Sequence, residues 1–104
     1  MELTKDADKM ICLIYKSFLQ SRKSGHSKAE ARRFDESALK SFPSLKAWHP
    51  QDINDALLEI GRKGLVKIYI GGDFELTDSG IIYMENRFKN GLLEVTDFIS
   101  KLIP

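Results

Sequence analysis

The feature that most restricts the fold is a stretch of twenty residues, Thr4 to Lys23, that contains neither glycine nor proline. Its apolar residues Ala7, Ile11, Ile14 and Phe18 recur at the spacing of one helix face. Further apolar residues between them widen this face beyond a single stripe, so we expect the helix to be buried on more than one side. The sequence therefore predicts a domain built around one central helix.

A capping box predicts where the second helix begins. Ser27 and Glu30 have the spacing at which a Ser hydroxyl and a Glu carboxylate each satisfy a free backbone N–H. This helix is short and is expected to run to Arg33 or Phe34. Residues 35–49 are less regular, and we expect a loop with one short helix around residues 36–40.

The third helix is predicted to begin at His49-Pro50, since proline is tolerated at the first helical position. It is expected to end near Lys63, because Gly64 lies where a left-handed helix end would fall. Residues 65–70 are then rich in β-branched and aromatic types, and residues 74–77 alternate apolar and polar types across a Gly-Gly-Asp turn. A β-hairpin is the expected structure.

Two more helices are predicted after the hairpin. The first begins at Asp78-Ser79-Gly80, with Thr77 or Asp78 as its cap, and is expected to end at Asn90-Gly91. The second runs from Leu92 to Ile103 and carries more apolar surface than one contact needs.

This order of elements is typical of a winged helix-turn-helix. The segment Asp55 to Asn86, DALLEIGRKGLVKIYIGGDFELTDSGIIYMEN, resembles the recognition helix, wing and post-wing helix of that family. The chain as a whole resembles small uncharacterised, YjcQ-like proteins of Gram-positive bacteria and their phages or mobile elements. The resemblance implies an α+β, mainly α fold, with a three-helix core, a two-stranded β-wing and two further C-terminal helices. It implies no particular activity.

Length and composition fit a single domain over residues 1–104, in which residues 78–104 serve core packing or dimerisation. With 42% apolar and 30% charged residues, the chain is expected to fold. Its longest apolar run, residues 10–15, is much shorter than the roughly 20 residues that cross a bilayer. The acidic N-terminal residues do not resemble a secretory signal, so we expect a cytoplasmic protein without membrane contact.

No set of residues has the spacing of a catalytic or metal site. Cys12 is the single cysteine and lies in the apolar run of the first helix, where we expect it to be a core residue. His26 and His49 have no partner at metal-ligand spacing, and nothing is placed to orient a nucleophile. We therefore expect a protein that is not an enzyme and has no cofactor or metal.

Basic residues are concentrated in the middle of the chain. Residues 16–46 hold eight basic and three acidic residues, a local net charge of +5 in a chain whose total is +1. Any polyanion partner should prefer this region, so double-stranded DNA is one candidate ligand, beside a protein partner. The predicted phosphate contacts are Arg22, Lys23, Lys28, Arg32 and Arg33, joined by Gln51 and Asn54 as base readers and by Lys67 as the wing cation.

Two functions remain open from the sequence. The first is a DNA-binding homodimer, a transcription-regulating factor of bacterial or mobile-element origin. The second is a protein-interaction module without DNA binding, which uses the acidic third helix (Asp52, Asp55, Glu59) and the apolar last helix. The residues predicted to dimerise are Leu92, Val95, Phe98, Ile99 and Leu102. The alternative for this last helix is that it folds back on the first helix.

Overall fold

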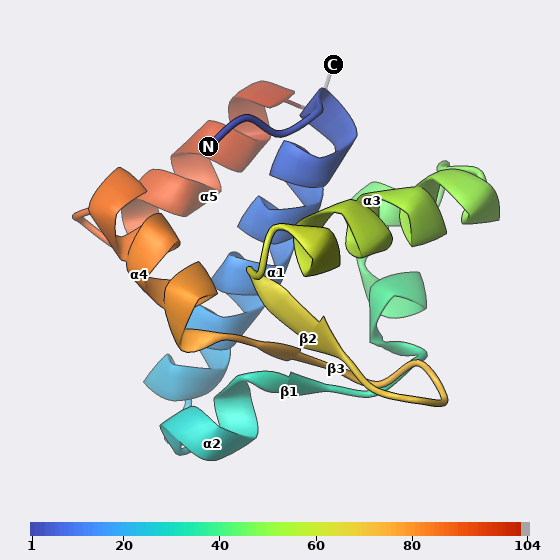
Figure 1. The fold of residues 1–104 in the computed structure, drawn as a ribbon. Coiled ribbons are helices and arrows are strands. Elements are labelled where there is room, and N and C mark those ends of the chain that lie inside the picture. Colours follow the sequence, from blue (N-terminus) through green and yellow to red (C-terminus); the bar gives the residue numbers. More distant parts are fainter. Residues whose placement is uncertain (103–104) are drawn as a thin grey trace.

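The computed structural model describes residues 1–102 and is organised around one long helix, α1 (Lys5–Lys23) (Figure 1). The Thr4 hydroxyl caps this helix by accepting a hydrogen bond from the Ala7 backbone N–H, at 3.2 Å. Met10, Ile11 and Ile14 are completely buried, and α3 and α5 both pack against α1. The prediction of a central helix with a wide buried face is confirmed.

The second helix is shorter than predicted. α2 spans Lys28–Ala31 and begins with the predicted capping box of Ser27 and Glu30. Arg33 and Phe34 are not helical, so the prediction that the helix continues to these residues was wrong; they form strand β1 (Arg33–Phe34). The Phe34 ring stacks on Phe74 with ring centroids 5.0 Å apart, and this cross-strand pair requires extended backbone.

The predicted hairpin is present, but the sheet has three strands where two were expected. β2 (Val66–Ile68) and β3 (Phe74–Leu76) pair antiparallel, and β1 adds to the other side of β3 to give the order β1-β3-β2. Gly71 and Gly72 make the turn with φ of +99° and +101°, a conformation that glycine adopts without strain. Phe74 and Leu76 are buried, so one face of the sheet belongs to the core.

Residues 35–49 contain two 3₁₀ helices instead of the single short helix expected around residues 36–40. These are η1 (Ala38–Ser41) and η2 (Pro43–Leu45). Pro43 has no backbone N–H and cannot continue the turn before it, so the segment breaks into two short pieces. Leu39 and Leu45 are buried and anchor both pieces to the core.

Helix α3 (Pro50–Arg62) follows these turns and has the predicted ends. His49 caps it by accepting the Gln51 backbone N–H on Nδ1, at 3.1 Å. Lys63 closes the helix, and Gly64 follows with a φ of +78°. Ala56, Leu57 and Ile60 form the buried side of α3.

Helix α4 (Asp78–Arg87) is capped by the Thr77 hydroxyl, which accepts the Gly80 N–H at 2.9 Å. The helix ends before the predicted Asn90-Gly91. Phe88 leaves helical geometry, with φ −120° and ψ 75°, and its buried ring packs against Phe98.

Helix α5 (Leu92–Leu102) completes the domain and packs on α1. Ile103, the predicted end of this helix, lies outside the described residues. The elements together make a mainly helical α+β domain with a small antiparallel sheet. None of the helices described within residues 1–102 is long and apolar enough to cross a membrane.

Candidate functional site

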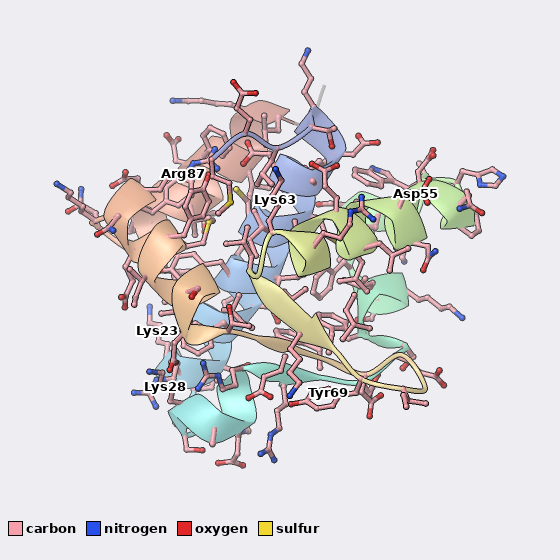
Figure 2. All side chains as sticks on the ribbon, in the orientation of Figure 1. Lys23, Lys28, Asp55, Lys63, Tyr69 and Arg87 are labelled. Carbon is pink, nitrogen blue, oxygen red and sulfur yellow. The ribbon has the colours of Figure 1, made fainter. Side chains whose placement is uncertain are left out.

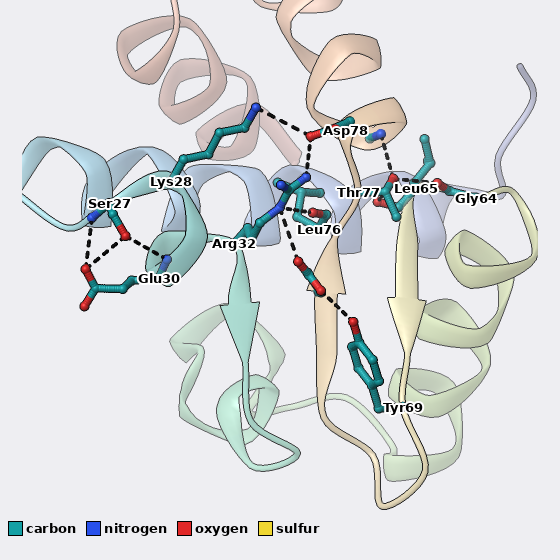
Figure 3. Close-up of polar contacts among 12 residues, drawn as sticks. Ser27, Lys28, Glu30, Arg32, Gly64, Leu65, Tyr69, Leu76, Thr77 and Asp78 are labelled. Carbon is teal, nitrogen blue, oxygen red and sulfur yellow. Dashed lines mark hydrogen bonds and ion pairs between the residues drawn. The ribbon is translucent and has the colours of Figure 1, made fainter.

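Two of the predicted phosphate contacts are paired within the chain itself (Figure 3). Arg32 donates from Nε to the Leu76 carbonyl at 2.9 Å and from Nη2 to Asp78 Oδ1 at 2.5 Å. Lys28 Nζ lies 3.5 Å from the same Asp78 oxygen. The hydrogen bond and charge of Arg32, with the charge of Lys28, lower the pKa of the Asp78 carboxyl. Arg32 therefore fixes the junction of α2 and β1 to the segment between β3 and α4, and its side chain is only 18% exposed.

The outer face of the sheet continues this chain of polar contacts. Glu75 lies 3.5 Å from Arg32 Nε and accepts the Tyr69 hydroxyl at 2.7 Å (Figure 3). The hydrogen bond to Glu75 is the main cause of a raised pKa for Tyr69. Lys67, which the sequence predicted to be the wing cation, lies over the Tyr69 ring, 5.0 Å from its centroid.

The remaining predicted phosphate contacts are exposed. Arg22 donates to the His26 carbonyl at 3.1 Å, while Lys23 and Arg33 have no ion pair within residues 1–102. Lys23 and Lys28 lie at the lower left of Figure 2, and Asp55, on the N-terminal half of α3, lies at the upper right. Lys23 and Lys28 are therefore far from the predicted base-reading end of α3.

The outer side of α3 carries one apolar and several polar residues. Gln51 Nε2 donates to Asp55 Oδ1 at 2.9 Å, and Leu58, one turn after Asn54, is 41% exposed. Glu59 is turned toward α1, where it accepts the Thr4 backbone N–H at 2.9 Å and its hydroxyl at 2.7 Å. These bonds from Thr4 lower the pKa of Glu59. Glu59 thus helps to fix α3 on the start of α1.

A groove of about 480 Å³ lies between α3, the two 3₁₀ helices and the hairpin, and we call it the α3 groove. It is open along one side. Its apolar lining is formed by Leu39, Leu45, Trp48, Pro50, Ile53, Leu57, Leu58 and Ile68, and its polar lining by Glu36, Lys40, Lys46 and Asn54. Most of the lining residues are therefore apolar. Asn54, which was predicted to read bases, is one of the polar residues of this lining.

Sequence reasoning did not find this groove. It is assembled from three separate segments, residues 36–48, 50–58 and 68–72. The one sequence signal was the presence of large apolar residues, among them Leu45 and Trp48, in the irregular segment 35–49. Leu45 is buried, whereas Trp48 stays half-exposed and lines the groove.

Cys12, His26 and His49 each have separate surroundings in the described part of the chain. Cys12 is fully buried, and this burial raises the pKa of its thiol to about 12. His49 is used as the cap of α3, and His26 lies 3.9 Å from Glu30 on an exposed turn. Within residues 1–102 there is no cluster of three or more His, Cys, Asp or Glu side chains that could hold a metal ion. The α3 groove, by contrast, presents apolar side chains together with the charged side chains of Glu36, Lys40 and Lys46.

The residues predicted to dimerise are divided between core and surface. Val95 and Ile99 are buried in the chain's own core, because α5 packs back on α1, as in the alternative left open by the sequence. Leu92 and Phe98 are half-buried, and Phe98 contacts the Arg87 guanidinium, 4.6 Å from its ring centroid. Leu102 is exposed, as is the neighbouring Leu93. Dimerisation through this helix stays a prediction.

No protein-family model, curated protein or solved structure matches the chain.

Proposed function

We propose that the chain is a winged-helix domain that works as a protein-interaction module, with the α3 groove as its docking surface. The order of elements supports the winged-helix part. The 3₁₀ helix η2 and α3 are separated by residues 46–49, a spacing that fits the three- to four-residue turn of a helix-turn-helix. The β2–β3 hairpin follows α3 directly, in the position of a wing.

The apolar lining of the α3 groove is the observation that carries the proposal. A DNA reader places the exposed side of its recognition helix against phosphates and base edges, where cations and polar groups are favourable. Here that side carries the exposed Leu58 and the carboxylate of Asp55 beside an open apolar groove. Apolar surface of this kind is buried favourably by another apolar surface, and Asp55 would be repelled by phosphate.

The partner that fits is a protein segment that inserts apolar side chains into the groove. Grooves between helices accept an amphipathic helix through a few apolar anchors. Trp48 stands in the lining, and tryptophan is among the residues that contribute most to binding energy at protein interfaces.

Site-specific photo-crosslinking in the native host cells tests this function. Benzoylphenylalanine in place of Leu58 puts a crosslinker at the groove, and the same residue in place of Leu93 is the matched control, because both leucines are exposed. We expect a discrete protein adduct from position 58 and none of the same mass from position 93. The proposal is contradicted if position 58 gives no adduct, or if its adduct contains nucleic acid.

DNA binding is the second candidate function, in which the domain acts as a transcription regulator. It is favoured by the exposed cations Arg22, Lys23 and Arg33 and by the polar side chains of Gln51 and Asn54 on the first turns of α3. Titration of labelled duplex DNA at two salt concentrations tests it. Salt-dependent binding that is weakened by Arg22→Ala with Lys23→Ala, and not by Leu58→Glu, would favour DNA binding over the docking function.

A further inference from the structure

We infer that the segment bound in the α3 groove is an acidic amphipathic helix. This inference rests on the proposed docking function and specifies the chemistry of its partner. Lys40 and Lys46 are the cations of the groove lining, both are exposed, and neither forms an ion pair within residues 1–102. Their charge is therefore available to a ligand.

The two lysines stand on one wall of the groove. Both belong to the segment with the 3₁₀ helices, while α3 on the opposite wall contributes Asn54 and apolar residues to the lining. The acidic lining residue, Glu36, lies at the hairpin end, where its backbone N–H donates to Asp73 Oδ1 at 2.9 Å and its Cβ approaches Gly72.

This arrangement selects an occupant with two different sides. Leu57, Leu58 and Ile68 require apolar side chains on the side that faces the groove. Carboxylates on the flank of the bound helix next to Lys40 and Lys46 would be attracted by the two lysines, whereas basic side chains at the same positions would be repelled. A helix with apolar residues at three- and four-residue spacing and acidic residues beside them meets both requirements.

Trp48 provides a direct readout of occupancy. It is the only tryptophan of the chain and it lines the groove, so its emission responds to groove occupancy. Lys9 lies over the same ring, 5.5 Å from its centroid, so the comparison between the two peptides, rather than a single emission shift, reports on the groove. An apolar segment that covers the indole should shift its emission to shorter wavelength and protect it from a soluble quencher.

The experiment titrates the purified chain with two designed helical peptides. Both carry leucines at the same positions, but one has glutamates and the other lysines on the flank. We expect the acidic peptide to shift the Trp48 emission and to bind about two- to thirtyfold more tightly than the basic one, the range given by two exposed ion pairs. Lys40→Glu with Lys46→Glu should reverse this order, and Lys16→Glu with Lys23→Glu, distant from the groove lining, should preserve it. Circular dichroism would check that each variant is folded.

Three outcomes would overturn the inference. If the wild type binds both peptides equally, or prefers the basic peptide, the groove does not select its ligand by charge. A Trp48 emission that changes with protein concentration alone would assign the groove to a second copy of the chain. If neither peptide binds, the acidic-helix partner is excluded. In each case a protein adduct at position 58 in cells would still support the docking function, so the two proposals fail separately.

Discussion

At the scale of single residues, Arg32 shows the largest difference between its predicted role and its role in the structure. Its sequence context, beside Arg33 in a basic segment, favoured a phosphate contact. In the fold it is mostly buried and bonds to the Leu76 carbonyl and the Asp78 carboxylate, whereas Arg33 is exposed. A local pattern of charge cannot distinguish these two roles, because the partners of Arg32 lie more than forty residues away in the chain.

Substitution of Arg32 should therefore lower stability more than substitution of Arg33. Arg32→Ala removes hydrogen bonds to a backbone carbonyl and to a carboxylate, and we expect a loss of about 1–3 kcal/mol in the free energy of unfolding. Arg33→Ala, the matched control, should change it by less than about 0.5 kcal/mol. Chemical denaturation of both variants measures the difference. Equal losses would show that the Arg32 contacts do not stabilise the fold.

The buried thiol of Cys12 gives a second prediction at this scale. Burial raises its pKa to about 12, so almost no thiolate is present near neutral pH and the sulfur is covered by the core. A disulfide reagent should leave Cys12 unmodified in the native protein at pH 8 and modify it fully in denaturant. Rapid modification of the native protein would contradict the packing of α1.

At the scale of elements, helices were easier to predict than their ends. α1, α3 and α5 follow from apolar periodicity and capping residues, which are local signals. β1 was missed because two residues carry no periodicity, and the strand exists through the stacking of Phe34 on the distant Phe74. The early end of α4 has the same kind of cause, since Phe88 leaves the helix to pack against Phe98. The α3 groove brings together residues of the separate segments 36–48, 50–58 and 68–72, so it too has no local signature.

The contact between α4 and the start of β2 depends on Gly80. A Cβ at this position would overlap the backbone oxygen of Leu65 and approach the side chain of Leu76. Alanine would favour the helix by at most about 1 kcal/mol, but overpacking against backbone costs about 1–3 kcal/mol. Gly80→Ala should therefore lower the melting temperature, and Ser79→Ala on the same turn should leave it nearly unchanged. A Gly80→Ala variant at least as stable as wild type would contradict this close approach.

At the scale of the whole molecule, several carboxylates connect elements or cap them. Glu30, Asp35, Glu59 and Asp78 each accept hydrogen bonds that lower their pKa. As the pH falls, the unfolded chain binds protons on these groups before the folded chain does. Their stabilising contribution is therefore complete above about pH 4.5 and is lost as the pH falls through their lowered pKa values.

Urea unfolding at pH 7 and at pH 3 should accordingly show lower stability in acid. Glu59→Gln removes one of the titrating groups, the one that accepts two bonds from Thr4. This variant should be less stable than wild type at pH 7 and should lose less stability between the two pH values. An unchanged difference between pH 7 and pH 3 would exclude a contribution from Glu59.

At this scale the predicted phosphate contacts of α1 and α2 lie apart from the α3 groove. Lys23 and Lys28 are far from Asp55 on α3 (Figure 2), whereas the groove is lined by residues of α3, the two 3₁₀ helices and the hairpin. The central claim is that the groove receives a protein segment. The most direct test treats the crosslinked adduct from position 58 with nuclease and identifies the attached species by mass spectrometry. We predict that nuclease leaves the size of the adduct unchanged and that the adduct contains peptides of a second protein; a nuclease-sensitive adduct would contradict the claim.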